Sequence, residues 1–429
     1  MNLNGEFQPI IIADSLGSYL STLVEDIPKP LLTICNRPLL FYQLDLFEKA
    51  GFDNVIILSQ ELTKQSLQQY VAEQYSGKLS IQLYLLEAQL GIAQTLLKLR
   101  DTSKKQFIVT SGDLIIEPKF IHTMLDYHLE KEATVTIALK ENAPESSDHT
   151  SKALRYGDII GIEAETGSNK LLMIVSSDEY ADTPLRVAHH LIDCFPSIKL
   201  RRNIIDTQFY IFSRFALDIL EKYKMIKNLK HEFIPLLLHC QYRPQLTKGI
   251  QNENMLSSAL KMSSAKLSDT GVYCLAHILD RKIYCIRVDT VSNFLEANRD
   301  LAAGNKYFVP LEPAHYKSFV AKSASISKKT RIGDQCVVGD ASKLGDFCTL
   351  KSSVVGKHCT ICNNVKIINC VIMDHVTIKE NCKLVNTVVC SNAYINEKSI
   401  LKDSVVGYRC TVEGSVEHDH ATLSVHSEL

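Results

Sequence analysis

The hydrophobic pattern of the last quarter of the chain repeats every 17 residues. The segments 353–369, 370–386, 387–403 and 404–420 align without gaps, and large aliphatic residues recur in them at intervals of six, six and five. Three short strands per turn, with each turn stacked on the one before, would produce this spacing. The pattern predicts a triangular parallel β-solenoid of roughly five coils, which we place at residues 323–420, with a tail at 421–429.

A second column of small or slender side chains supports this register. It lies two residues before each aliphatic position, and alternation along a strand turns both columns inward. We therefore expect its cysteines to be core thiols. Six of the thirteen cysteines belong to it: Cys336, Cys348, Cys359, Cys370, Cys382 and Cys410.

The first two-thirds of the chain alternates between strand-like and helix-like patterns, which indicates a doubly wound, mostly parallel α/β sheet over residues 1–304. The expected strands are 8–13, 52–59, 81–87, 106–113, 133–140 and 282–290. The expected helices are 38–51, 61–77, 91–100, 118–132, 226–241 and 292–304. We interpret 141–152 as a loop, 251–268 as partly disordered, and 305–322 as a linker to the solenoid.

The composition argues against nucleic-acid-binding, membrane and secreted proteins, but it does not indicate an activity. Lys and Arg number 47 and Asp and Glu 48, so bulk charge does not favour nucleic acid or an anionic membrane as a partner. The amino terminus has no basic segment followed by an apolar one, and no apolar run is long enough for a membrane span. We expect a cytosolic chain with reduced cysteines.

The loop after the first strand is the first candidate site. Loops that bind phosphates are rich in glycine, whereas residues 13–19 contain only Gly17, with Asp14 and Tyr19 beside it. Lys29, in the sequence Pro-Lys-Pro, and Asp113, after Gly112, complete the nucleotide-binding candidates.

Other motifs in the solenoid favour structural roles. Cys359 is predicted to point inward and Cys362 outward, so this CxxC pair does not suit zinc. His358 and His375 are predicted to be surface residues in one column. Three corner residues, Asn369, Asn386 and Asp403, are expected to satisfy the backbone of turns.

The order of these motifs along the chain resembles that of the sugar-nucleotide pyrophosphorylases. These enzymes use Mg²⁺ to join a nucleoside triphosphate to a sugar 1-phosphate. The stretches 28–30, 112–113 and 295–298 carry the resemblance. It implies a Rossmann-like nucleotidyltransferase domain followed by a left-handed parallel β-helix of hexapeptide repeats. It also aligns Asp113 with the first metal aspartate of that family, and Arg287 with the second.

Several replacements weaken the implied chemistry. Tyr19 stands where the family has a phosphate-binding arginine, Asp14 would repel a polyphosphate, and Arg287 cannot ligate a metal. Asp289, two residues on, is predicted to lie on the same strand face as Arg287. We therefore expect no catalytic residues, no bound metal and no cofactor, with Gly17, Lys29 and Asp113 as remnants of a nucleotide site.

A degenerate fold of this kind resembles the gamma and epsilon subunits of eukaryotic translation initiation factor 2B, and the gamma group more closely. That resemblance implies pairing with the epsilon subunit, assembly with the alpha, beta and delta subunits, and support for GDP/GTP exchange on initiation factor 2. Because the chain stops soon after the solenoid, we expect no exchange domain of the epsilon type. Two alternatives remain: an active mannose-1-phosphate guanylyltransferase-like enzyme, and a module that binds a nucleotide or sugar phosphate without turnover.

Overall fold

The computed structural model forms two compact units, each built from segments that are distant in sequence. The sheet unit comprises Met1–Asp14 and Leu44–Cys285, and the solenoid unit comprises Ser15–Gln43 and Ile286–Leu429. The residues that the structure describes are 3–13, 20–25, 27–87, 90–102, 105–141, 158–164, 169–176, 185–195, 197–248, 271–304 and 319–424. Residues 142–152, 251–268, 305–318 and 425–429 of the expected loops, linker and tail lie outside them.

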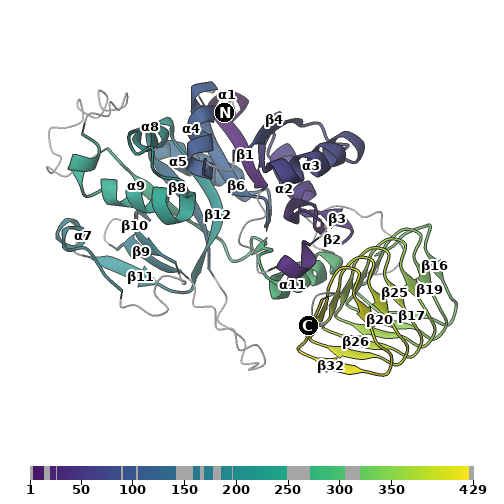
Figure 1. The fold of residues 1–429 in the computed structure, drawn as a ribbon. Helices are drawn as coiled ribbons and strands as arrows, with labels where there is room; N and C mark the ends of the chain where they lie inside the picture. Colours follow the sequence, from purple (N-terminus) through teal and green to yellow (C-terminus); the bar gives the residue numbers. More distant parts are fainter. Residues whose placement is uncertain are drawn as a thin grey trace. The chain divides into compact units, whose positions relative to one another are not determined.

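A seven-stranded mixed sheet forms the centre of the sheet unit, as the alternating pattern predicts (Figure 1). Its strand order is β13-β8-β12-β6-β1-β4-β5, and only β12 runs antiparallel to its neighbours. The strands are β1 (Phe7–Ala13), β4 (Asn54–Ser59), β5 (Ser80–Leu85), β6 (Gln106–Ser111), β8 (Val135–Glu141), β12 (Ile204–Phe212) and β13 (Cys274–Leu279). Parallel β1, β4 and β6 are mostly buried runs of aliphatic residues, because such strands are covered on both faces.

Helices and a smaller sheet complete this unit. The helices are α1 (Leu3–Glu6), α3 (Glu61–Glu73), α4 (Ile92–Thr102), α5 (Phe120–Glu130), α7 (His189–Cys194), α8 (Arg214–Lys222) and α9 (Ile234–Cys240). The smaller antiparallel sheet consists of β9 (Ile159–Glu163), β10 (Leu171–Val175) and β11 (Ile198–Arg201). Helix α2 (Leu39–Lys49) crosses the boundary between the units.

Three local expectations need correction. The helix expected at 226–241 is a π-helical turn, η3 (Leu229–Phe233), that leads into α9, and Pro235 follows the junction. The strand expected at 282–290 is only β14 (Cys285–Arg287). The sequence analysis assigned no strand to β13, whose partner β8 lies more than 130 residues earlier.

The carboxyl-terminal part is a parallel β-solenoid, as the 17-residue repeat predicts (Figure 1). Its three sheets contain seven, six and six strands, and each strand pairs in parallel with the one a coil later. The strands run from β15 (Phe319–Val320) to β33 (Thr422–Leu423), so β15 falls inside the stretch that we assigned to the linker.

We name the three faces by their outward residues. The valine face consists of β15, β18 (Val337–Val338), β21 (Val354–Val355), β24 (Val371–Ile372), β27 (Val388–Val389), β30 (Val405–Val406) and β33. The threonine face consists of β16 (Ser325–Ile326), β19 (Lys343–Leu344), β22 (Thr360–Ile361), β25 (Thr377–Ile378), β28 (Tyr394–Ile395) and β31 (Thr411–Val412). The lysine face consists of β17 (Arg331–Ile332), β20 (Thr349–Lys351), β23 (Lys366–Ile368), β26 (Lys383–Val385), β29 (Ile400–Lys402) and β32 (Glu417–Asp419).

The predicted inward columns form the solenoid core. Large aliphatic residues such as Ile361 and Ile378 are buried in one cluster, together with all six predicted core cysteines. Burial raises the pKa of the Cys359 and Cys370 thiols to about 12, so these thiols are unreactive packing groups.

Candidate functional site

Asp113 lies where ligands usually bind in an open α/β sheet, just past the carboxyl end of β6. Its side chain is buried, and the Ser111 hydroxyl donates a hydrogen bond of 2.6 Å to its Oδ1. Gly112 precedes it and donates its N–H to the Ile12 carbonyl at the end of β1. A Cβ at Gly112 would lie 2.9 Å from that carbonyl oxygen, so this close approach requires glycine.

The other two candidate nucleotide-binding residues belong to different segments. Lys29 begins the short 3-10 helix η2 (Lys29–Leu31), which belongs to the solenoid unit, and Lys29 is buried. Gly17 lies outside the described residues, as do Asp14 and Tyr19. Asp113 belongs to the sheet unit. That Gly17, Lys29 and Asp113 together form one nucleotide-binding site therefore stays a prediction.

The segment around Arg287 is organised as the start of a helix. Helix α11 (Val291–Ala302) has Thr290 as its N-cap, whose hydroxyl accepts from the Asn293 N–H. The Asn293 side-chain amide donates to the Arg287 carbonyl at 3.0 Å and to the Asp289 carboxylate at 2.9 Å. Asp289 was expected on the same strand face as Arg287, but β14 ends at Arg287, and Asp289 instead joins the helix start.

The asparagine of the LEAN stretch has a structural partner that the sequence analysis did not foresee. Asn298 is buried on α11, and its Oδ1 accepts a hydrogen bond from the Cys35 N–H at 2.9 Å. Cys35 and Asn36 have positive φ angles of 48° and 62°, which form the tight turn between β2 (Thr33–Ile34) and β3 (Arg37–Pro38). Burial raises the pKa of the Cys35 thiol to about 12, so this cysteine is not a nucleophile.

The valine face of the solenoid is covered by this same amino-terminal segment and by α11. The Asn36 amide donates to the Val355 carbonyl at 3.2 Å, and the Cys390 thiol lies 3.6 Å from the Thr22 carbonyl. Helix α11 also packs against β21. Four outward valines are therefore only 0–5% exposed: Val337, Val354, Val371 and Val388. The signal was available in the sequence, because these strands carry valine at the outward position where a solvated face would be polar.

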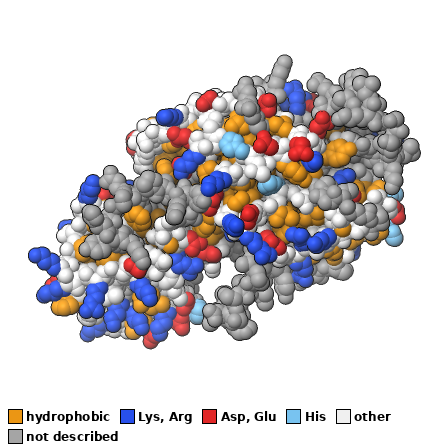
Figure 2. All heavy atoms as spheres, turned by 180° about the vertical axis from the view of Figure 1, so that it is seen from behind, with side chains coloured by type: hydrophobic (Ala, Val, Ile, Leu, Met, Phe, Trp, Pro, Cys, Tyr) orange, Lys and Arg blue, Asp and Glu red, His pale blue; other side chains and the backbone are white. Residues whose placement is uncertain are grey.

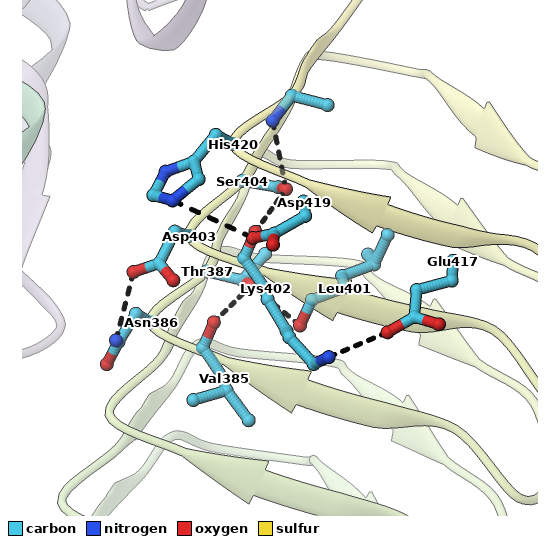
Figure 3. Close-up of polar contacts among 11 residues, drawn as sticks. Val385, Asn386, Thr387, Leu401, Lys402, Asp403, Ser404, Glu417, Asp419 and His420 are labelled. Atoms are coloured by element: carbon cyan, nitrogen blue, oxygen red, sulfur yellow. Dashed lines mark hydrogen bonds and ion pairs between the residues drawn. The ribbon is translucent and has the colours of Figure 1, made fainter.

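Metal and redox candidates in the solenoid do not form a closed site. Cys359 points inward and its thiol donates to the Met373 carbonyl, whereas Cys362 is half-buried on the threonine face. Among the described residues, one group of possible ligands converges: the exposed Asp403, Asp419 and His420, whose ligand atoms lie within 4.8 Å of one another (Figure 3). A structural zinc site has four converging ligands, so three exposed groups fall short of one.

Two columns of polar side chains run along corners of the solenoid, one of histidines and one of asparagine and aspartate. The exposed His358 and His375 rings stack with centroids 4.9 Å apart and planes within 6° of parallel. The Asn369 amide donates to Asn386, and the Asn386 amide donates to Asp403. These three side chains thus bond to one another instead of to turn backbone, because the 17-residue spacing stacks them directly.

Comparison with known proteins matches both parts of the chain. A nucleotidyl transferase family model matches residues 8–148, and a model of the left-handed β-helix (LbH) domain of the eIF2B epsilon subunit matches residues 315–418. The gamma subunit of translation initiation factor eIF2B from Dictyostelium discoideum is 33% identical over 392 residues, which cover 83% of this chain and 88% of that protein. This chain belongs to the eIF2B gamma subunit family.

A second eIF2B gamma relative, from Schizosaccharomyces pombe, is 26% identical over 80% of this chain and 73% of its own length. Similarity to enzymes covers less of the chain. The D-glycero-alpha-D-manno-heptose 1-phosphate guanylyltransferase of Aneurinibacillus thermoaerophilus is 30% identical over 31% of this chain and 57% of that enzyme. The nucleotidyl transferase model includes Lys29 and Asp113 but ends well before Arg287.

The fold predicted from the sequence is therefore confirmed for this eIF2B gamma family member: a nucleotidyltransferase-like sheet followed by a left-handed β-helix. Within the described residues, no helix is both long and apolar enough to cross a membrane.

Proposed function

We propose that this chain is a non-catalytic subunit of a cytosolic factor 2B complex, which pairs with the epsilon subunit and supports GDP/GTP exchange on initiation factor 2. The observation that carries the proposal is similarity to the Dictyostelium gamma subunit along 83% of this chain and 88% of that relative. The alpha, beta and delta subunits would be further partners in the same complex.

The chemistry of the described residues supports a role without nucleotidyl transfer. Mg²⁺ is bound by carboxylates and phosphate oxygens, and an arginine stands at the position aligned with the second metal aspartate. The nearest carboxylate in the chain, Asp289, accepts from Asn293 at the start of α11. Asp113 would thus lack its partner carboxylate for a two-aspartate metal site.

The construction of the solenoid unit supports a role in assembly. The amino-terminal segment and α11 contact the valine face, so this part of the nucleotidyltransferase sequence and the solenoid fold as one unit. Such a unit offers a rigid surface to partner subunits, because packed secondary structure fixes the positions of its outward side chains.

Affinity purification followed by native mass spectrometry tests the assembly part of this proposal. The full-length chain with a carboxyl-terminal tag would be purified from a cytosolic extract at moderate salt, with the tag on an unrelated β-solenoid protein as control. We expect a species whose mass equals one copy of this chain plus one epsilon subunit, together with larger complexes. Recovery of this chain alone under conditions that preserve other complexes would overturn the pairing.

A further inference from the structure

The three faces of the solenoid differ in how their outward side chains are neutralised or covered. On the valine face, the outward residues are covered by the chain itself. On the threonine face, the matching row contains one charged residue, Lys343, and five uncharged ones: Ser325, Thr360, Thr377, Tyr394 and Thr411. The lysine face differs from both, because it is solvent-facing and strongly cationic.

The outward rows of the lysine face bring like charges together. Lys366 and Lys383 are directly paired in neighbouring coils, and adjacent strands lie only about 4.8 Å apart. Like charges opposite each other in a sheet are destabilising. The cations of this face come from five consecutive coils: Arg331, Lys351, Lys366, Lys383 and Lys402.

Only one of these five cations has a carboxylate partner among the residues that the structure describes. The Lys402 ammonium lies 2.6 Å from Glu417 Oε1 (Figure 3). The outward carboxylates of the face, Glu417 and Asp419, both belong to the last coil. Glu417 also attracts Lys383, which lies two coils earlier in the same row. The cations of the first three coils are therefore not balanced by carboxylates on the face itself. Lys and Arg side chains are also frequent on the side of the solenoid that Figure 2 shows at its lower left.

Aliphatic side chains lie among these cations. Ile368 and Val385 are neighbours in register, with Lys351 before them and Lys402 after them in the same row. Figure 3 shows Val385 and Lys402 together on this side of the sheet. Ile368, Val385 and Ile400 are all only half-buried, so the face carries aliphatic side chains interspersed with cations.

A hollow of about 410 Å³ lies at the first coils of the same face. Arg331, Gly333 and Lys351 line it, together with the carboxylate-bearing Asp334. The hollow offers room for a side chain between two cations.

We propose that the lysine face is a docking surface for an acidic segment of a partner protein that also carries aliphatic side chains. Carboxylates of the segment would pair with Lys351, Lys366 and Lys383, and its aliphatic side chains would cover Ile368 and Val385. The occupant is a protein segment rather than RNA, because the described face offers aliphatic residues instead of aromatic platforms for bases. The proposal does not depend on the role in nucleotide exchange.

Fluorescence anisotropy with the full-length chain tests this proposal. The probe is a fluorescein-labelled peptide of alternating Glu and Ile, and two further probes are its Glu/Ser analogue and a 20-nucleotide single-stranded RNA. We expect the Glu/Ile peptide to bind, the Glu/Ser peptide to bind several-fold more weakly, and RNA to bind more weakly still. The double variant Lys366→Glu/Lys383→Glu should weaken binding of the Glu/Ile peptide by at least about tenfold, because charge complementarity is reversed at the centre of the face.

The matched control is Lys343→Glu/Lys357→Glu, which reverses two exposed charges away from this face. It should leave the affinity within about twofold of the unmodified chain, and circular dichroism should show that both double variants fold. No binding of the Glu/Ile peptide, equal losses in the two double variants, or tighter binding of RNA than of the peptide would each overturn the proposal.

Discussion

The Oδ1 atom of Asn298 accepts a hydrogen bond from the backbone N–H of Cys35, although 263 residues separate the two in sequence. The Cys35 thiol in turn lies 3.2 Å from the Asn298 carbonyl. The turn that follows β2 is thus joined to α11, and its next residue, Asn36, contacts the valine face. The LEAN stretch therefore has a structural role in this chain that needs no bound nucleotide.

Replacing Asn298 with alanine should destabilise the chain by about 1–3 kcal/mol, because the buried Cys35 N–H would lose its acceptor. The measurement is equilibrium unfolding in urea. Glu296→Ala is the matched control, since Glu296 is exposed on the same helix, and it should unfold at nearly the same urea concentration as the unmodified chain. Equal midpoints for both variants would contradict a structural role for Asn298.

The register of the solenoid predicts opposite outcomes for two adjacent residues. Ile378 is fully buried in the core, so Ile378→Ala should cost about 2–5 kcal/mol through lost burial and a residual cavity. Lys379 points outward, with its ammonium 5.6 Å from the Tyr394 ring centroid, so Lys379→Ala should shift the melting temperature far less. Differential scanning calorimetry compares the two, and equal shifts would mean that the register is wrong by one residue.

A buried histidine should make stability fall in mild acid. Burial lowers the pKa of His128 to about 3, and its ring lies 2.7 Å from the Thr136 hydroxyl and 3.0 Å from Gln106 Oε1. Between pH 6.5 and pH 3 the unfolded chain binds a proton at this residue that the folded chain does not, so stability falls as pH falls. This residue should account for roughly 1 kcal/mol per pH unit below pH 6.

Unfolding free energies measured from pH 7 to pH 5 check this expectation. His128→Gln should show a shallower loss than the unmodified chain, and His122→Gln, at an exposed position on the same helix, should keep the full loss. His239 and His277, whose pKa values burial also lowers, are present in all three proteins and cancel in the comparison. The same slope in His128→Gln as in the unmodified chain would show that this histidine is not the cause.

The purified chain should release no pyrophosphate from a nucleoside triphosphate and a sugar 1-phosphate with Mg²⁺. Arg287→Asp should not restore activity, because Asp14 and Tyr19 still replace the phosphate-binding residues of the loop. A coupled pyrophosphate assay with a panel of sugar 1-phosphates measures this, with an active guanylyltransferase as positive control. Mg²⁺-dependent turnover by the unmodified chain would favour an enzyme instead.

The solenoid was predictable because its signal is local and repeated. Each coil carries the same inward pair, such as Cys359 with Ile361, so an error at one position is corrected by the next coil. The strand β13 was missed because its assignment depends on β8, a long-range partner that a local pattern cannot reveal. The same holds for Asn298, whose partner Cys35 is remote in sequence.

For the candidate nucleotide site, the sequence predicted which residue types are present better than it predicted where their side chains lie. Asp113 lies at a strand end as expected, because the alternation of strands and helices locates strand ends well. Asp289 was misplaced, because hydrogen bonds at the start of α11, not strand alternation, determine its direction. The covered valine face was missed although the register identifies the outward valines, because a local pattern cannot reveal which remote segment covers them.

A GDP-release time course tests the central claim most directly. Initiation factor 2 loaded with fluorescent GDP would be mixed with excess unlabelled GDP and with the epsilon subunit alone, this chain alone, or both together. We predict no acceleration by this chain alone, and faster release with both proteins than with the epsilon subunit alone. Equal rates for the epsilon subunit with and without this chain, at concentrations where the two co-purify, would contradict the claim that this chain is an activating subunit of the exchange factor.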